Sequence, residues 1–279
     1  MRPGRRSTSV RAAALAAGAA LVLVSSTACS SGPTLVWSDE FTGPSGSPAD
    51  PAVWGPMTGG KGWGNQELEC YTDSRDNSAL DGNGFLVISA REAKGHACAD
   101  GSTNDYTSAR LSTQGRKTFE HGTLSVRAKM PTGDGAWPAF WALGQNHDTA
   151  GWPASGEIDV TEVVGKEKNV THGTLHGPTA DGKPFSVTGK YAAPSDLSSD
   201  FHVYSATWSA TSVAFAIDDV VFNTVTKADV EKSGRWVFDQ PFYLLLDVAV
   251  GGNFPGDPSA SSVWPQQMVI DWVRVYQDR

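Results

Sequence analysis

Three acidic residues lie within six positions of one segment that favours a β-strand. Glu157, Asp159 and Glu162 belong to the sequence Glu-Ile-Asp-Val-Thr-Glu. Residues two apart share a face of a regular strand, so Glu157 and Asp159 would point one way and Glu162 into the core. Because a buried unpaired Glu is costly, we expect a β-bulge near Val160 and Thr161 that returns Glu162 to the face of the other two.

This row of carboxyl groups has the composition needed for glycoside hydrolysis. With the bulge, the two Glu carboxyls could approach the roughly 5–5.5 Å separation of a retaining glycosidase. Glu157 would be the nucleophile, Glu162 the general acid/base, and Asp159 would hydrogen-bond the nucleophile. Carboxylates this close do not all ionise easily, so we expect a shared proton. Taken alone, the segment could also be a solvated acidic face or a calcium-binding patch.

Aromatic residues precede the acidic row by about twenty positions. In the sequence Trp-Pro-Ala-Phe-Trp, Trp137, Ala139 and Trp141 would share one face of a strand. The two Trp rings could stack on the apolar faces of sugar rings, or they could pack one sheet against the other. Phe140 falls on the opposite face and fits the core.

Two further segments could contact a sugar. The run at 61–67 places Trp63 near Asn65 and amide and acidic groups, either as a binding loop or as an ordinary surface loop. His172 and His176 lie in a segment rich in Thr, Gly and Val, which excludes the helix that a zinc pair at this spacing needs. His176 could hydrogen-bond a carboxylate or a sugar hydroxyl, or it could be a structural histidine.

A scaffold of strands must position these residues. Apolar and β-branched segments bounded by Gly, Pro, Asp and Asn predict strands throughout the chain. The segments are 34–37, 85–90, 107–111, 123–130, 136–143, 158–164, 170–175, 203–208, 213–217, 242–250 and 269–276. Only residues 227–232 favour a helical turn. Strands without intervening helices predict an all-β fold, either a two-sheet sandwich or a barrel.

The N-terminus predicts export. Residues 1–28 combine a basic start, an apolar stretch and Ser-Thr-Ala before Cys29, which is typical of a secretory signal peptide. The apolar stretch is too short for a transmembrane segment. Cys29 would be either a lipidated anchor on the outer face of a bacterial membrane or the first residue of a secreted chain. Residues 29–33 would form a tether and residues 34–279 a single catalytic domain, located outside the cell.

Charge and cysteine content restrict the function further. The formal net charge is -8 over 279 residues, and the predicted leader removes four Arg and no acidic residue. This balance argues against a nucleic-acid partner, since phosphate binding needs Lys and Arg. Cys70 and Cys98 predict one disulfide, with two buried thiols as the alternative. We expect a monomer, because no feature implies an oligomer.

Five motifs together resemble glycoside hydrolase family 16, in its laminarinase branch. They are Glu-Ile-Asp-Val-Thr-Glu at 157–162, Trp-Pro-Ala-Phe-Trp at 137–141, Trp-Gly-Asn-Gln-Glu at 63–67, Val-Gly-Gly-Asn-Phe-Pro-Gly at 250–256 and Ile-Asp-Trp-Val-Arg-Val-Tyr at 270–276. The matches occur in the family's order and cover most of the predicted mature chain.

The resemblance implies a β-jelly-roll of two curved antiparallel sheets with a cleft across the concave face. It implies retaining endo-hydrolysis of a β-linked polysaccharide, most often β-1,3-glucan, with no cofactor required for catalysis. It assigns Glu157, Glu162 and Asp159 the roles given above. The family's cleft positions are Trp63, Asn65, Trp137, Trp141, His176 and Asn253. The alternatives are a mixed-linkage glucan or a β-galactan as substrate, or a non-catalytic glucan-binding protein.

The resemblance also implies a structural Ca²⁺ ion on the convex side. Backbone carbonyls at Glu40 and Gly84 and the side chain of Asp271 would bind it.

Three positions depart from the residues that are frequent in the family. Thr161 stands where Met is frequent, Asp247 where Asn is frequent, and Phe254 where Trp is frequent. The sugar preference is therefore less constrained than the reaction type.

Overall fold

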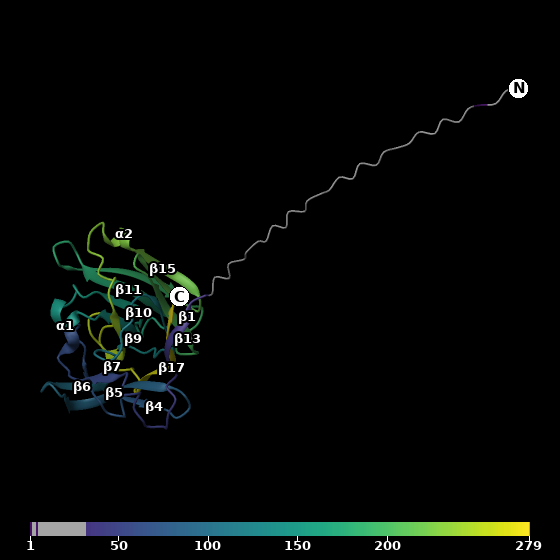
Figure 1. The fold of residues 1–279 in the computed structure, drawn as a ribbon. Coiled ribbons are helices and arrows are strands. Elements are labelled where there is room, and N and C mark those ends of the chain that lie inside the picture. Colours follow the sequence, from purple (N-terminus) through teal and green to yellow (C-terminus); the bar gives the residue numbers. More distant parts are fainter. Residues whose placement is uncertain (2–3, 5–31, 279) are drawn as a thin grey trace. The chain divides into compact units, whose positions relative to one another are not determined.

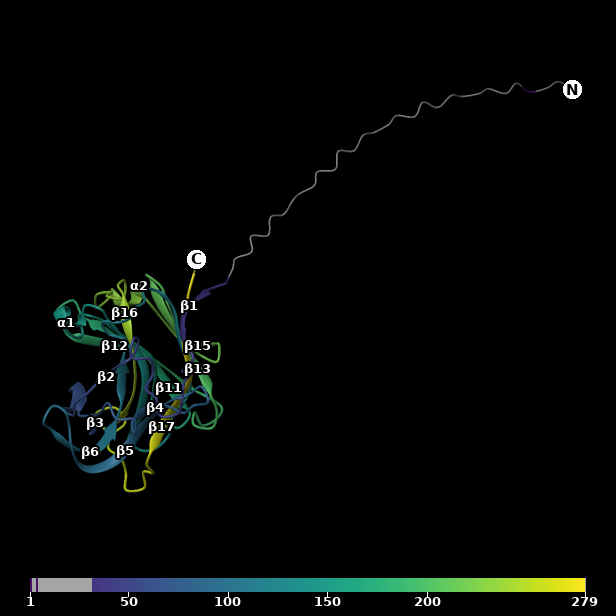
Figure 2. The same cartoon turned by 60° about the horizontal axis from the view of Figure 1, so that its bottom comes forward.

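Two antiparallel β-sheets pack face to face in the computed structural model of the chain (Figure 1, Figure 2). The structure describes residues 1, 4 and 32–278. The predicted signal peptide and Cys29 lie outside the described residues, apart from Met1 and Gly4. Within the described part of the chain, no helix is long and apolar enough to cross a membrane.

Strands contain most of the secondary structure. In chain order they are β1 Thr34–Asp39, β2 Gly55–Met57, β3 Glu69–Tyr71, β4 Ser78–Leu80, β5 Leu86–Ala97, β6 Thr103–Ser108, β7 Arg110–Ser112, β8 Gly122–Lys129, β9 Ala136–Gly144, β10 Glu157–Val163, β11 Val170–Pro178, β12 Pro184–Ala192, β13 His202–Trp208, β14 Ser212–Ile217, β15 Val220–Thr226, β16 Phe242–Val250 and β17 Gln266–Gln277. The helical segments are the 3₁₀ turn Gly62–Gly64, α1 His147–Ala150 and α2 Lys227–Val230.

Among the described residues, the larger sheet has ten strands and the smaller has seven. The order in the smaller sheet is β12-β11-β10-β9-β16-β7-β2, so β9, β10 and β16 are central. The larger sheet runs β15-β14-β13-β8-β17-β5-β6-β3, with β1 beside β17 and β4 beside β5. Neighbouring strands are antiparallel except for β3 and β6, which run parallel. The predicted all-β sandwich is confirmed.

The core lies between the two sheets. Phe140, Ile158 and Leu244 of the smaller sheet are fully buried in one cluster with Val126 and Ile270 of the larger sheet. Since side chains alternate along a strand, the other residues of β9, β10 and β16 face away from this core. That outward face of the smaller sheet carries the cleft described below.

One predicted strand is wrong. Residues 107–111 do not form one strand: β6 ends at Ser108 and β7 begins at Arg110 in the other sheet. The hydroxyl of Ser108 donates to the carbonyl of Val248 at 2.6 Å and fixes this crossing. Both halves are β-prone, so local pattern does not reveal the change of sheet. No pattern in the sequence indicates α1, which is a single helical turn.

The predicted disulfide is confirmed. Cys70 on β3 is bonded to Cys98, which follows β5 directly, with 5.4 Å between their Cα atoms. The bond ties β3 to the β5–β6 hairpin.

Candidate active site

Strand β10 contains the predicted bulge. Trp141 and Phe140 are consecutive on β9, but their partners on β10 are Asp159 and Thr161, which leaves Val160 as an extra residue. The alternation of β10 therefore reverses at this point, and its three acidic side chains line one cleft. We call these side chains the β10 row. The bulge is confirmed, and it places Glu162 beside the other two carboxyl groups.

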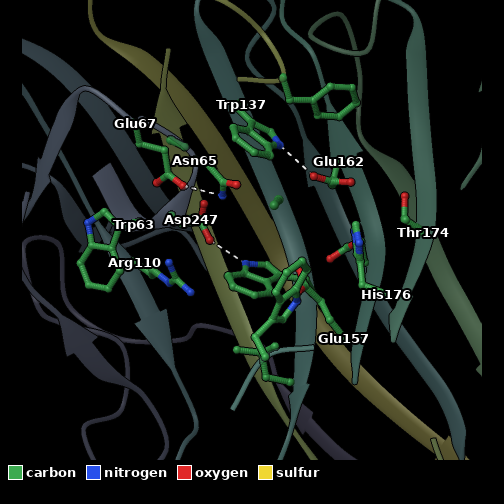
Figure 3. Close-up of a pocket in the computed structure, with 18 of the residues that line it drawn as sticks. Trp63, Asn65, Glu67, Arg110, Trp137, Glu157, Glu162, Thr174, His176 and Asp247 are labelled. Atoms are coloured by element: carbon green, nitrogen blue, oxygen red, sulfur yellow. Dashed lines mark hydrogen bonds and ion pairs between the residues drawn. The ribbon is translucent and has the colours of Figure 1, made fainter. Parts of the chain in front are cut away.

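The cleft lies on the outward face of the smaller sheet and has a volume of about 830 Å³. Figure 3 shows labelled residues from opposite sides of this cleft, with Trp63 and Glu67 on the left and Glu162 and His176 on the right. All the predicted catalytic and sugar-binding residues line it: Trp63, Asn65, Trp137, Trp141, Glu157, Asp159, Glu162, His176 and Asn253.

Indole N–H groups hold three of the carboxylates in the cleft. Trp152 donates to Glu157 at 2.7 Å, Trp137 to Glu162 at 2.9 Å and Trp141 to Asp247 at 2.6 Å. Such a donor fixes the orientation of a carboxylate and favours its ionised form. The indoles therefore position the acidic groups as well as offering apolar faces.

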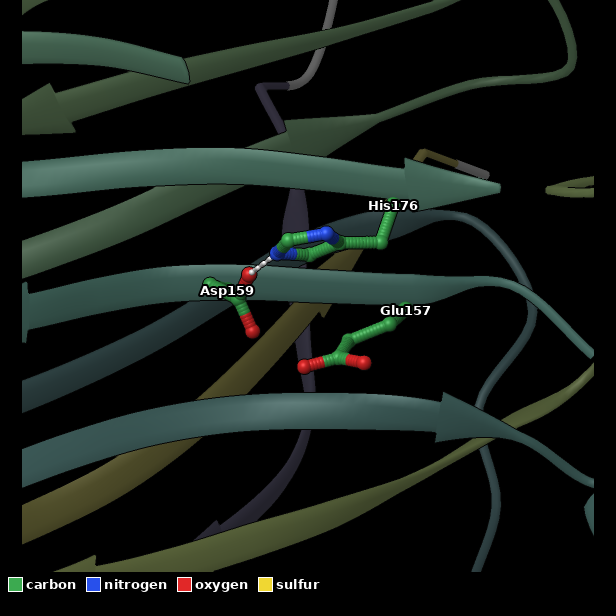
Figure 4. A group of neighbouring side chains, drawn as sticks. All are labelled: Glu157, Asp159 and His176. Carbon is green, nitrogen blue, oxygen red and sulfur yellow. Dashed lines mark ion pairs between the residues drawn. The ribbon is translucent and has the colours of Figure 1, made fainter. Parts of the chain in front are cut away.

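Asp159, the middle residue of the β10 row, has a histidine partner. Asp159 is almost fully buried, and its Oδ2 lies 3.1 Å from Nε2 of His176 on β11. Figure 4 shows this pair beside the carboxyl group of Glu157. One oxygen or nitrogen atom from each of the three side chains lies within 4.8 Å of the others, a spacing that would also suit a metal ion. His176 thus contacts a carboxylate, which was one of the alternatives open from the sequence.

Burial controls the ionisation of the row. Desolvation, reinforced by the charge of Asp159, raises the pKa of Glu157 to about 8. Desolvation raises the pKa of Glu162 to about 7, with Glu157 and Asp247 adding to the shift and His176 and Trp137 opposing it. The pKa of Asp159 is also well above its usual range, through burial and the neighbouring Glu162. The row therefore retains protons near pH 7 and titrates as a unit.

A tight turn brings Trp63 to the cleft. Gly62, Trp63 and Gly64 all have positive φ, with 47° at Trp63, where a residue with a side chain is uncommon. The ring of Trp63 packs edge-on against Tyr71 at 5.3 Å, and Asn65 Nδ2 donates to Glu67 at 3.0 Å. The two glycines permit the turn, and these contacts hold its side chains at the cleft wall.

The structure adds cleft residues that the sequence analysis did not select as site residues. They are Glu67, Arg110, Trp152, His172, Tyr243 and Asp247, with Phe254 at the rim against Trp137 and His172. For Asp247 a signal existed, because it is the only charged residue of the apolar segment 242–250. Arg110 had no comparable signal, since its strand was not separated from the preceding one.

Two of the three residues of the predicted calcium site, Glu40 and Asp271, form ion pairs. The guanidinium of Arg127 donates to the carboxylate of Asp271, and Arg274 donates to both carboxylate oxygens of Glu40 at 3.0 and 2.9 Å. Gly84 lies in a turn with φ of 94°. The pair with Arg127 disfavours a second cation at the Asp271 side chain, and the calcium site stays a prediction.

Comparison with known proteins places this cleft in a family. The family model described as "Glycosyl hydrolases family 16" matches residues 66–274. A β-glucanase of Rhodothermus marinus is 42% identical over 253 residues, covering 87% of this chain and 85% of the relative. A glucan endo-1,3-β-glucosidase of Cryptopygus antarcticus is 42% identical over 243 residues, covering 82% and 86%.

A solved structure agrees in both fold and sequence. The laminarinase catalytic domain of Thermotoga maritima has a TM-score of 0.80 and 40% identity, with 88% of this chain and 99% of that chain covered. The family match spans the acidic row, the aromatic segment and the final strand. The chain belongs to glycoside hydrolase family 16.

Proposed function

We propose that the chain is an endo-acting hydrolase of β-1,3-glucan that retains anomeric configuration. The observation that carries the proposal is the bulge of β10, which puts Glu157 and Glu162 on one face of an open cleft with Asp159 between them. The substrate class rests on the relatives named for β-glucan, endo-1,3-β-glucan and laminarin hydrolysis, at 40–42% identity.

In the first step, the Glu157 carboxylate attacks the anomeric carbon of the sugar. This step requires the state of the β10 row in which the shared proton lies on Glu162 and Glu157 is ionised, although burial raises the pKa of Glu157 more than that of Glu162. The bond from that carbon to the glycosidic oxygen breaks, and the Glu162 carboxylic acid gives its proton to the leaving oxygen. The product is a glycosyl ester of Glu157. Asp159 orients Glu157, and His176 holds Asp159 at 3.1 Å.

In the second step, the Glu162 carboxylate removes a proton from water. The resulting hydroxide oxygen attacks the anomeric carbon, the ester bond to Glu157 breaks, and both glutamates return to their starting states. These steps use only side chains of the chain and water. Two displacements at one carbon retain the configuration of the sugar.

Aromatic and amide groups would bind the polysaccharide on both sides of the scissile bond. Trp137, Trp141 and Trp63 offer ring faces along the cleft, and Asn65 and Asn253 offer hydrogen bonds to hydroxyl groups. We further propose that the enzyme acts outside the cell, either free or held by a lipid on Cys29. The disulfide between Cys70 and Cys98 supports an oxidising compartment.

The test is incubation of residues 30–279 with laminarin, barley mixed-linkage glucan, agarose and β-1,3-galactan. Product size and reducing ends are followed, with Glu157→Gln as the blank. We expect rapid shortening of laminarin, and proton NMR should show the β-anomer in the first product. Cleavage of another polymer but not of laminarin would assign a different polysaccharide as the substrate, and Phe254 would be the first residue to examine. An inverted first product would exclude the double displacement, and binding without cleavage would support a glucan-binding protein.

A further inference from the structure

A fourth carboxylate of the cleft lies in the same cross-strand row as the proposed general acid/base. Asp247 on β16 pairs with Ala139 on β9, and Ala139 pairs with Glu162 on β10. On its other side Asp247 pairs with Arg110 on β7. Paired residues of adjacent strands point to the same face of a sheet. Asp247 and Glu162 therefore face the cleft together, with Ala139 between them in the cross-strand row.

The distance across this row is short enough for electrostatic coupling. Two strand spacings of about 4.8 Å separate the backbones of Asp247 and Glu162 by about 10 Å, and both side chains rise from the sheet into the cleft. Asp247 is 5% exposed and Ala139 is 7% exposed, so little solvent lies at the base of the row. Charges are screened less in such a setting than at an open surface.

The polar partners of Asp247 do not cancel its charge. Oδ1 accepts from Trp141, and Oδ2 accepts from the hydroxyl of Tyr71 at 3.2 Å. That hydroxyl also lies 3.1 Å from Glu67, and with a single proton it can donate to only one carboxylate at a time. These are neutral donors, so an ionised Asp247 keeps its field.

The nearest cation is directed elsewhere. The guanidinium of Arg110 lies 4.8 Å from the ring of Trp63 and 4.5 Å from the ring of Trp141. Among the described residues, it makes no direct ion pair with Asp247. Arg110 moderates the potential at Asp247 without neutralising the carboxylate.

We propose that Asp247 is a positioning residue that keeps the proton on Glu162 and so extends catalysis to higher pH. A negative charge across the row disfavours ionisation of Glu162, which must carry a proton in the first step. This inference rests on the proposed function, in which Glu162 is the general acid.

The charged groups around the pair act in both directions: Glu157 and Asp247 raise the pKa of Glu162, and His176 lowers it. The charged and titratable groups around Asp247 are Arg110, Glu67, Glu69, Tyr71, Asp159 and Glu162. Those around Glu162 are Glu157, Asp159, His172, His176 and Asp247, and Glu167 and Lys190 lie beyond His172. Burial raises the pKa of Asp247 to about 6, with Arg110 opposing the shift, below the value of about 7 for Glu162.

The test is the pH dependence of kcat/KM on laminarin for the wild type and Asp247→Asn. Asn has nearly the same shape and keeps an oxygen that accepts from Trp141, so the variant removes mainly the charge. We expect the alkaline limb to move to lower pH by about 0.5–1 unit, while the acid limb stays in place. The matched control is Asp105→Asn, which removes one exposed acidic charge from β6 in the larger sheet and should move neither limb.

A measurement without turnover separates this inference from the proposed function. The side-chain carboxyl of Glu162 is titrated by ¹³C NMR, assigned by the signal that Glu162→Gln loses, and its midpoint should fall in Asp247→Asn. If that midpoint falls but no polymer is cleaved, the coupling stands and the proposed function fails. An unmoved midpoint and unmoved limbs, with only a lower kcat, would overturn the inference and leave Asp247 a structural role.

A second variant guards against a folding defect. Asp247→Ala also removes the charge, but it takes away the acceptor for Trp141 as well. Thermal melting establishes that each variant is folded. The same limb shift in both folded variants is expected, whereas a shift seen only with Ala would attribute the effect to the lost hydrogen bond and contradict the inference.

Discussion

Two groups of carboxylates meet in the cleft, and they are built differently. The β10 row comes from a single strand, and Glu157 and Glu162 remain partly exposed in the cleft. A second group, which we call the floor group, consists of the carboxyl groups of Glu67, Glu69 and Asp247 with the hydroxyl group of Tyr71. It joins β3 and the preceding loop to β16, with 176 positions between Tyr71 and Asp247.

The floor group is held together by donors from the protein. The backbone N–H of Val250 donates to Glu69 at 2.6 Å, and the hydroxyl of Tyr71 lies within 3.2 Å of both Glu67 and Asp247. Burial raises the pKa of Glu69 well above its usual range, with the charge of Glu67 adding to the shift. In the β10 row, by contrast, the glutamates have indole donors and open space. We infer that the row is arranged for substrate, that Glu69 and Tyr71 hold β3 against the smaller sheet, and that Asp247 interacts with both groups.

The largest expected effect comes from the row. Glu157→Gln removes the proposed nucleophile and should lower kcat on laminarin by about 10³-fold or more, because no glycosyl ester can form. The amide has nearly the same shape, so the melting temperature and the affinity for laminarin should change little. Reducing-end assays, thermal melting and calorimetric binding measure the three quantities. Turnover near the wild-type rate would mean that another group is the nucleophile.

The contrast between the two groups also explains what the sequence could predict. The β10 row was predictable because its three acids lie within six residues, and a Glu facing the core required a bulge. Strand β16 was predicted with its observed bounds because its apolar run is uninterrupted except at Asp247. These inferences need only local pattern and the cost of burying charge.

The floor group was not predictable in the same way. Its members become neighbours only through the register of β16 against β7 and the placement of β3, which depend on packing across the whole domain. The change of sheet between Ser108 and Arg110 sets that register, and a one-residue error there would turn Arg110 away from the cleft. The family resemblance gave the positions of the cleft residues but not their hydrogen-bond partners.

An intermediate effect is expected from the floor group, on the stability of the fold rather than on the rate of laminarin hydrolysis. Tyr71→Phe removes the hydroxyl shared by Glu67 and Asp247 and leaves both buried carboxylates short of a donor. We expect the free energy of unfolding to fall by about 1–3 kcal/mol and the melting temperature by about 2–4 °C for each kcal/mol. Laminarin turnover below the melting range should stay within several-fold of the wild type.

The control for this variant is Tyr106→Phe, which removes a hydroxyl from the partly buried tyrosine on the neighbouring strand β6. It should change the melting temperature less than Tyr71→Phe does. If Tyr71→Phe were as stable as the wild type but lost most of its kcat, the floor group would belong to the catalytic machinery and the contrast with the row would fail.

The smallest effect is expected at the rim, and it tests the roles within the row. Trp152 is 48% exposed and donates to Glu157, so water can partly replace its indole in Trp152→Phe. Loss of a donor raises the pKa of a carboxyl group, and the nucleophile must be ionised. The acid limb of kcat/KM should therefore move up by a few tenths of a pH unit.

Trp137→Phe removes the donor to Glu162, which must be protonated in the first step. In this variant the alkaline limb of kcat/KM should move up instead. If the two variants moved the opposite limbs from those expected, the nucleophile and the acid would have to be exchanged.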